Sequence, residues 1–429
     1  MRFELIQVKG WHRGYCTKLS NLQYNIYMQK TTGPDSQSLK ILQTSIFFVS
    51  QPFFIMGLLL PIYGKGIGAN AVEIGIIFSA FSVVTIIMRP IVGWALDKFG
   101  RRLFFVMGTL TYALTMISFA YSGSVWNFIG ARLLQGAASA CAMLAASAII
   151  ADLTTDKNRA QAFGKFAQAT SRGSITGAFI AFSLYNIPSL TEANSDIDLQ
   201  RFLFLIFAGF AIIGSLIAIS KLPETKYQQS IGRRQPIIWS RPWQLLILVT
   251  LVTAAAWAMT SPILILFLQE KLNARVDFIA WAFLPSGLIW ATMPSKLGRL
   301  ADRFGRKPLM VLGLAVSAVT MFILPSIKSI LWLAILWSLL ALCFAAGDPA
   351  EQALVAELTG GNQHGRAYGF YVMASDIGAA LGPLGGGWLY DAVNVTAPFF
   401  ATGIVLALCG FILFFFLQLP KPISRINQS

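Results

Sequence analysis

Apolar runs of about 20 residues recur along the whole chain, and short polar stretches separate them. A run of this length crosses the hydrocarbon of a bilayer as an α-helix. Lipid offers no partner for an unpaired backbone N–H or C=O group, so a spanning segment must satisfy these groups internally. Only 12% of the 429 residues are charged, about half the fraction in an average soluble domain. The pattern predicts an all-α polytopic membrane protein.

Twelve such runs can be placed, six on each side of a basic linker. The first six cover roughly 41–63, 72–95, 103–121, 126–151, 161–184 and 201–220. The last six cover roughly 243–268, 277–298, 308–325, 330–356, 366–388 and 396–418. The predicted divisions are a cytoplasmic tail at 1–40, a six-helix half at 41–220, a cytoplasmic linker at 221–241, a second six-helix half at 242–419 and a cytoplasmic tail at 420–429.

The first 40 residues are polar and lack the apolar core of a signal peptide. They are either a cytoplasmic extension or an over-long start that precedes an initiator at Met28. The run Thr32–Ser36 contains Gly, Pro, Asp and Ser, which predicts a loop before the first span.

The cationic residues fall mainly on one side of the predicted membrane. Of the 33 Lys and Arg residues, 23 lie in the termini and the loops on the same side, five lie on the other side, and five lie within spans or at their ends. Cytoplasmic loops carry this excess in membrane proteins, which predicts that both termini are cytoplasmic. The net charge of +15 therefore needs no nucleic-acid partner, and the short loops favour a bacterial-type inner (plasma) membrane.

A short cationic motif occurs twice, as GWALDKFGRR at Gly93–Arg102 and as GRLADRFGRK at Gly298–Lys307. The copies are 205 residues apart, and each lies between two predicted spans. The same offset relates ADLT at Ala151–Thr154 to AELT at Ala356–Thr359. One register over this distance indicates two duplicated halves. The motif positions are Gly93, Asp97, Gly100, Arg101, Gly298, Asp302, Gly305 and Arg306.

The pattern G-x-x-x-D-x-x-G-R-[RK] resembles the loop between spans two and three of the major facilitator superfamily, and the resemblance covers nearly everything from residue 41 to 418. It implies two parallel six-helix halves with a substrate site between them, near the middle of the membrane. It also implies transport by alternating access.

The motif arginines are positioned to reach an acid at the inner end of span four or ten. These acids, Asp152 and Glu357, are again 205 residues apart. We hypothesise that Arg101–Asp152 and Arg306–Glu357 are latch pairs, which hold the cytoplasmic ends together in the outward-facing state and loosen in the inward-facing one. The alternative is a basic loop that only sets the topology.

Arg132 lies inside span four, in the sequence ARLLQG. This resembles the R-x-x-Q-G motif that is associated with the proton pathway in drug:proton antiporters of the superfamily. A charge within a span is costly and indicates function. Arg132 is 20 residues before Asp152, or ~30 Å from the inner end at ~1.5 Å per residue, so snorkelling to the outer interface is the alternative. Arg89, near the inner end of span two, is expected to snorkel there.

Four charged residues lie in the middle of predicted spans: Arg172 in span five, Asp348 and Glu351 in span ten, and Asp376 in span eleven. Counting ~1.5 Å per residue places them at similar depth. We hypothesise that Arg172 faces Asp348 or Asp376 and that this centre couples protons or substrate to transport. The alternative is a static pair that holds helices together.

Span eleven carries small residues at helical spacing together with a proline. Small residues allow close helix contact in lipid, so this face is predicted to pack tightly. The G-P-x-x-G-G pattern is typical of span five in antiporters of the superfamily, whereas span five of this chain has no proline. The residues of the span-eleven motif are Gly378, Gly382, Pro383, Gly385 and Gly386.

The sequence carries no signature of several other protein classes. Four cysteines and two histidines without metal-ligand spacing predict no metal site. No phosphate-binding G-x-x-x-x-G-K-[ST] motif is present, and no nucleophile with a matching base points to an enzyme. No cofactor is expected.

The sequence therefore predicts a secondary active transporter, and the favoured mode is proton-coupled export of a small amphipathic or drug-like molecule. One alternative is an uptake permease for a small metabolite. Another, from a different class, is a transport-inactive membrane sensor or scaffold. The expected partners are a small-molecule substrate, protons and the lipid bilayer, and the chain is expected to function as a monomer.

Overall fold

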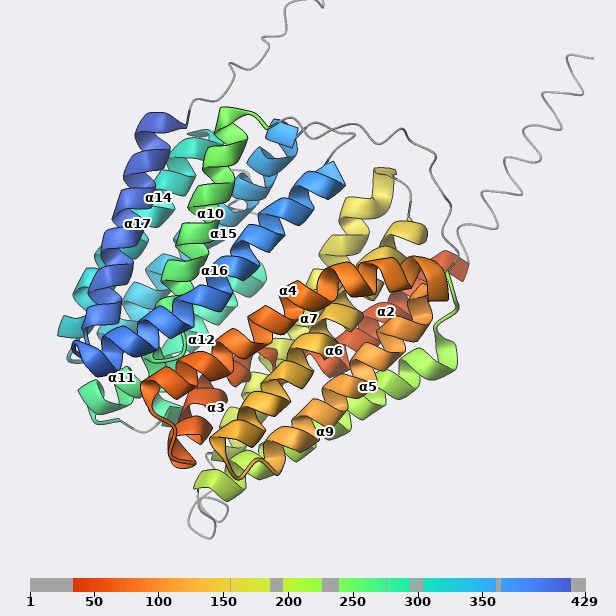
Figure 1. Ribbon diagram of the computed structural model, residues 1–429, viewed down its shortest axis with the longest axis horizontal. Helices are drawn as coiled ribbons and strands as arrows, with labels where there is room; N and C mark the ends of the chain where they lie inside the picture. The colour runs from red at the N-terminus through yellow and green to blue at the C-terminus, as the bar shows by residue number, and fades with distance from the viewer. Residues whose placement is uncertain are drawn as a thin grey trace, which may run out of the picture.

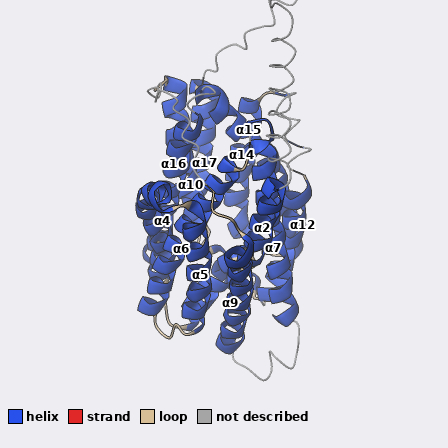
Figure 2. Cartoon of the chain, turned by 90° about the vertical axis from the view of Figure 1, so that its right-hand side faces the viewer, coloured by secondary structure: helices blue, strands red, loops and turns tan. Residues whose placement is uncertain are grey.

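The computed structural model describes residues 34–154, 156–185, 196–225, 239–274, 276–293, 297, 304–359 and 364–417. All regular secondary structure in these ranges is helical, and no strand is drawn in Figure 2. The predicted all-α class is confirmed.

The helices of the first half follow one another with short connections. They are α2 (Pro34–Val49), α3 (Phe53–Gly66), α4 (Ala71–Phe99), α5 (Arg101–Ala120), α6 (Val125–Asp152), α7 (Asp156–Tyr185) and α9 (Asp196–Lys221). The second half repeats this order. Its helices are α10 (Arg241–Thr260), α11 (Leu264–Leu272), α12 (Val276–Thr292), α14 (Arg306–Ile323), the 3-10 turn η1 (Leu324–Ser326), α15 (Ile330–Thr359), α16 (His364–Ala392) and α17 (Ala397–Phe416).

Nine helical segments in the described part of the chain are long and apolar enough to cross a membrane. One of them, Ser36–Gly66, joins α2 and α3. The predicted spans five, eight and eleven correspond to α7, α12 and α16, which are shorter or more polar than these nine. The polar residues within α7 and α16 include Arg172 and Asp376, two of the predicted site residues.

The first helix begins earlier than predicted. α2 starts at Pro34, inside the predicted loop Thr32–Ser36 and seven residues before the predicted span. Proline is favoured in the first turn of a helix, where its missing N–H would have no partner in any case. The same residues that suggested a loop therefore start a helix.

The two halves lie side by side, as Figure 1 shows in red to yellow-green and in green to blue. Within the first half, α5 packs against α6 and α9, and α4 packs against α6. Within the second half, α10 packs against α16, and α14 packs against α15 and α17. Among the described residues, the main contacts between the halves are those of α4 with α16, α7 with α12, and α3 with α11.

The glycines of α16 lie directly against backbone, as the small-residue motif predicts. A Cβ atom at Gly378 or Gly382 would lie 2.3 or 2.2 Å from a carbonyl oxygen of α10, and one at Gly386 would lie 1.9 Å from the carbonyl oxygen of Met259. Gly385 is different, because the nearest atom to its Cβ position is the end of the Met259 side chain at 3.9 Å.

Pro383 of the same motif faces the other half. Its carbonyl oxygen would lie 2.3 Å from a Cβ atom at Gly75 of α4. The α16 motif therefore holds α10 on one side and α4 on the other, which joins the two halves through close backbone contact.

Candidate functional site

Polar contacts join the halves at one end of the molecule, which we call the contact end. Lys65 Nζ lies 2.7 Å from Glu270 Oε1, and the backbone N–H of Val72 donates to Asp391 Oδ2 at 3.1 Å. Lys65 and Glu270 are 205 residues apart, so they occupy equivalent positions of the duplication. Equivalent positions approach each other at the axis that relates two such halves, and this pair therefore lies close to that axis.

The opposite end carries Lys98, Arg101 and Arg102 at the junction of α4 and α5, and we call it the basic end. Figure 1 shows α4 and α16 diverging toward this end. The helices α4 and α16 of the two halves thus meet at the contact end and separate toward the basic end.

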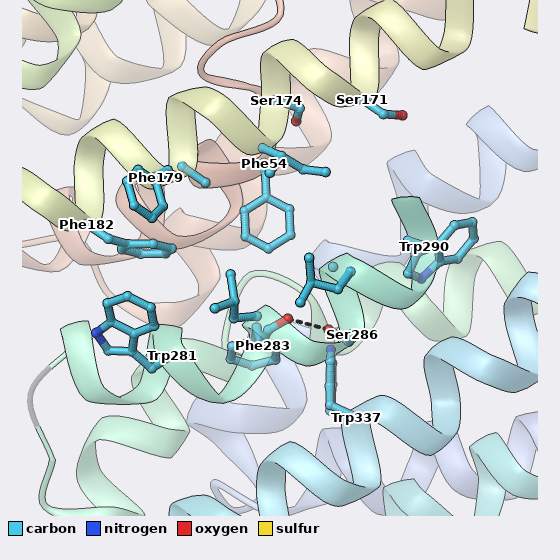
Figure 3. Close-up of a pocket in the computed structure, with 15 residues that line it drawn as sticks. Phe54, Ser171, Ser174, Phe179, Phe182, Trp281, Phe283, Ser286, Trp290 and Trp337 are labelled. Carbon is cyan, nitrogen blue, oxygen red and sulfur yellow. Dashed lines mark hydrogen bonds between the residues drawn. The ribbon is translucent and has the colours of Figure 1, made fainter. Parts of the chain in front are cut away.

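A cavity of about 420 Å³ lies between the halves, bounded by α3 and α7 of the first and by α12 and α15 of the second. We call it the central cavity (Figure 3). Its volume is within the range of small-molecule sites. Hydroxyl groups come from Ser171, Ser174 and Ser286. The aromatic walls include Phe54, Phe179, Phe182, Trp281, Trp290 and Trp337.

The aromatic rings of the central cavity come from both halves. The rings of Phe182 and Trp281 face each other across the halves with centroids 6.4 Å apart, and Phe283 meets Trp337 edge to face at 5.1 Å. Sequence reasoning missed these residues. A cavity-facing tryptophan and a lipid-facing tryptophan look the same in a sequence, because both surroundings are apolar.

Arg132 does not reach the outer interface. Its side chain is buried, with 7% of the residue exposed. Its Nε donates to the carbonyl oxygen of Ile77 at 3.0 Å, and its Nη1 donates to Gln135 Oε1 at 2.5 Å. Gln135 in turn donates to the hydroxyl of Tyr112 at 2.8 Å. The snorkelling alternative is wrong, because neutral groups of α4 and α6 already solvate the guanidinium inside the half.

Arg132 also lines a second cavity, of about 330 Å³, within the first half. The faces of Phe78 and Phe81 lie 4.9 Å from its guanidinium carbon. We call this space the arginine cavity. It shares no lining residue with the central cavity.

Asp348 and Glu351 lie on one face of α15 inside the second half, as their spacing predicts. They line a small cavity of about 60 Å³ together with residues of α10, α14 and α17. Glu351 Oε1 accepts a hydrogen bond from the hydroxyl of Thr250 at 3.0 Å. No cation pairs with either acid among the described residues.

Asp376 pairs with Arg89 rather than with Arg172. The carboxylate of Asp376 on α16 forms an ion pair with the guanidinium of Arg89 on α4, which links the two halves. The expectation that Arg89 snorkels is therefore wrong. Arg172 is exposed on α7, next to Ser171 of the central cavity, and it forms no ion pair in the described part of the chain.

The hypothesis that Arg172 faces Asp348 or Asp376 is not borne out by this geometry. Residue counting fixes how deep a side chain lies along its helix, and all four residues are at similar depth. The direction in which each side chain points depends on how the helices pack, and counting carries no information about it.

The first predicted latch pair is in contact. Arg101 Nε lies 3.0 Å from Asp152 Oδ2, and both side chains are nearly buried, with 5% and 13% exposed. Both residues belong to the first half, and the pair is intact although the halves diverge at this end. The predicted loosening in the inward-facing state stays a prediction. The latch role itself stays a hypothesis.

A residue of the linker completes this loop. Glu224 Oε1 accepts hydrogen bonds from the backbone N–H groups of Arg101 at 2.6 Å and Arg102 at 3.3 Å. It thereby caps α5, whose N-cap residue Gly100 has no side chain. Thr225 donates to Asp152 Oδ2 at 3.0 Å. Sequence reasoning missed both residues, although Leu-Pro-Glu-Thr was visible as a segment after span six.

The motif glycines have two different environments. Gly100 and Gly305 have φ angles of +97° and +88°, which L side chains rarely adopt. Gly93 instead has open space where a Cβ atom would lie, so no close contact of the described residues requires a glycine there. Gly298 and Asp302, and the side chains of Asp97 and Glu357, lie outside the described residues, so the second predicted latch pair stays a prediction.

Comparison with known proteins agrees with this architecture. The Major Facilitator Superfamily model matches residues 44–249 and 246–429. Multidrug resistance protein 1 of Bacillus subtilis (strain 168) is 26% identical over 381 residues, which cover 86% of this chain and 94% of that protein. The synaptic vesicular amine transporter of Homo sapiens is 24% identical over 368 residues, which cover 83% of this chain and 68% of that protein.

Solved structures show the same fold. A bacterial homologue of the human lysosomal transporter Spinster, in an inward-facing and occupied conformation, superposes with a TM-score of 0.73 at 14% identity. The superposition covers 89% of this chain and 96% of that structure. With a family match along nearly its whole described length and two duplicated helical halves around a cavity, this chain belongs to the major facilitator superfamily.

Proposed function

We propose that this chain exports small amphipathic or drug-like molecules and that protons drive the export. The walls of the central cavity support the substrate class, because aromatic and aliphatic side chains suit a flat apolar body. The relatives support it too, since they include a multidrug resistance protein and an amine transporter.

In the proposed cycle the chain alternates between two states. If the basic end faces the cytoplasm, the described structure is the inward-facing state, closed at the contact end. Opening to the outside then requires Lys65 to leave Glu270 and Val72 to leave Asp391. The Arg89–Asp376 pair lies between α4 and α16, the helices that diverge toward the basic end, so it is placed to change with the state.

The observation that carries proton coupling is the position of Asp348 and Glu351. Both acids lie within a span, and only neutral groups bind them among the described residues. A lone charged carboxylate inside the membrane is costly, and acids at such places mark proton relays in transporters. We therefore assign the proton to this pair and the substrate to the central cavity.

The test uses purified full-length protein in liposomes that enclose a pH-sensitive dye. A proton gradient is imposed, and aromatic amphiphiles, simple metabolites and buffer alone are added in turn. We expect one class of aromatic amphiphile to trigger proton movement. Asp348→Asn should slow this movement by at least about tenfold, whereas Asp198→Asn, an exposed control, should leave it unchanged.

Two outcomes would change the proposal. Full proton movement in both Asp348→Asn and Glu351→Gln would show that these two acids do not carry the transported proton. Uptake of a radiolabelled metabolite without any proton movement would favour the uptake permease. A chain that moves neither protons nor any compound would fit the sensor or scaffold instead.

The location and assembly belong to the same proposal. We place the chain in the plasma (inner) membrane as a monomer, with both termini in the cytoplasm. In a cysteine-free background, Lys98→Cys should react with a membrane-impermeant maleimide only from the cytoplasmic side, and Lys65→Cys only from the opposite side.

A further inference from the structure

The arginine cavity has a cation that its protein partners do not neutralise. Arg132 has five N–H donors, and the described residues accept two of them, through Ile77 and Gln135. Its other partners are the faces of Phe78 and Phe81. All four partners are neutral.

The walls of the cavity supply no counter-charge either. Its lining contains Tyr112, Gln135 and Ser139 as polar groups and no carboxylate. A buried charge is stable when an opposite charge or a full set of hydrogen bonds surrounds it. An anion that enters the cavity would meet both a guanidinium without a described counter-charge and N–H donors that the described residues leave free.

The rest of the lining is apolar and has the size of a small ligand. Phe53, Met56, Leu60 and Phe81 form part of the wall, and the volume of about 330 Å³ is at the lower end of the range for small-molecule sites. The space is therefore suited to a compact apolar body that carries one anionic group.

We propose that the arginine cavity is a binding site for a small amphipathic carboxylate. The carboxylate accepts hydrogen bonds from the free N–H groups of Arg132, since a guanidinium binds a carboxylate with two parallel hydrogen bonds. The aromatic or aliphatic body packs against Phe53 and Phe81. A cation with the same body is excluded by the charge of Arg132.

The site is independent of the proposed export function. It lies within the first half and has no lining residue in common with the central cavity. The bound carboxylate could be a transported molecule or a fatty acid of the membrane. The test separates these two sources.

The experiment titrates purified full-length protein in a nonionic detergent by calorimetry. Three probes share one body and differ only in charge: 2-naphthoate, its neutral methyl ester and 2-naphthylmethylammonium. We expect 2-naphthoate to bind about tenfold to hundredfold more tightly than the ester, the range for hydrogen bonds to a charged group. The ammonium probe should not bind in this cavity.

Two variants keep the test decisive. Arg132→Gln should reduce the affinity for 2-naphthoate to that of the ester. Gly57→Leu should abolish binding while Arg132 stays in place, because Gly57 lines the cavity and has no atom within 4 Å of its Cβ position. Gly130→Leu is the matched control, since Gly130 is exposed on α6 and also has open space at its Cβ position.

The outcomes decide both the site and the source. Equal affinities for 2-naphthoate and its ester would overturn the proposal, as would unchanged binding of 2-naphthoate in Gly57→Leu. Gly57-dependent accumulation of 2-naphthoate in liposomes would identify a transported carboxylate. A fatty acid that copurifies with the unmodified chain and is lost in Gly57→Leu would identify a resident lipid.

Discussion

The two halves share their backbone packing. In the first half, a Cβ atom at Gly173 of α7 would lie 2.2 Å from the carbonyl oxygen of Phe47 on α2, and one at Gly177 would lie 1.9 Å from that of Gln51, in the turn after α2. In the second half, Cβ atoms at Gly378 and Gly382 of α16 would lie 2.3 and 2.2 Å from carbonyl oxygens of α10. These glycines are 205 residues apart in pairs, so the duplication has kept the same helix contact twice.

The charges in the middle of the spans, by contrast, are not shared. The position equivalent to Arg132 holds Trp337, and the positions equivalent to Asp348 and Glu351 hold Met143 and Ala146. The first half thus carries a buried cation among neutral groups, and the second half carries buried acids among neutral groups. Close helix packing is required wherever two spans meet in lipid, whereas a charge inside a span is kept only where a function needs it.

The junction of α4 and α5 is closed by the segment that follows α9. Glu224 of this segment caps α5 beside Gly100 by accepting hydrogen bonds from the backbone N–H groups of Arg101 and Arg102.

The largest expected effect is at the first latch pair. Arg101→Gln leaves the nearly buried Asp152 with the hydroxyl of Thr225 alone, and breaking one partner of a buried pair costs about 3–5 kcal/mol. The melting temperature in nonionic detergent should fall accordingly, and by more than in Arg102→Gln, whose Nη2 donates only to the carbonyl oxygen of Ile219. The double variant Arg101→Asp with Asp152→Arg should recover part of the loss, and no recovery would count against the pairing.

The shared helix contact comes next. Gly177→Ala and Gly382→Ala each force a methyl group onto a backbone carbonyl, which costs about 1–3 kcal/mol for an overpacked site. The two losses of unfolding free energy should be similar. Gly209→Ala, which has open space at its Cβ position, should be neutral or stabilising. Unequal losses of unfolding free energy in the two variants would show that the equivalent glycine contacts do not stabilise the two halves equally.

A smaller effect is expected at the cap of α5. Glu224→Gln keeps the shape of the side chain but removes the charge that attracts two backbone N–H groups, so it should cost about 1 kcal/mol, as for other helix caps. The melting temperature of Glu224→Gln should be lower than that of Asp198→Asn. If the two variants melt together, the linker does not stabilise the loop.

The smallest effect is expected at the contact end. More than half of each side chain in the Lys65–Glu270 pair is exposed, 55% and 54%, and exposed pairs contribute about 0–1 kcal/mol. Glu270→Gln should therefore change the melting temperature far less than Arg101→Gln. Added salt should remove the difference in melting temperature between Glu270→Gln and the unmodified chain. A large loss would mean that this pair, and not the glycine contact between α4 and α16, holds the halves together.

The sequence by itself determined the helical class, the duplication and one specific contact. Uncharged runs of about 20 residues leave no other structure in lipid, and a constant offset of 205 shows the repeat. Arg101 and Asp152 could be paired because a short loop and the end of a span restrict both residues to one end of the half. The Lys65–Glu270 contact could also have been considered from the sequence, because the two residues are 205 positions apart and equivalent positions can meet at the axis that relates the halves.

Only the tertiary structure decided which way each side chain points. Arg132, Arg172 and Asp376 lie within helices, as expected, yet Asp376 pairs with Arg89, and Arg172 pairs with no described acid. Trp281 and Trp337 line a cavity although nothing in the sequence separates them from lipid-facing tryptophans. In a membrane, both the lipid and a substrate cavity can favour apolar side chains. The hydrophobic periodicity that reveals the buried face of a soluble helix therefore does not show which face of a spanning helix points into the protein. The packing of neighbouring helices supplies it instead.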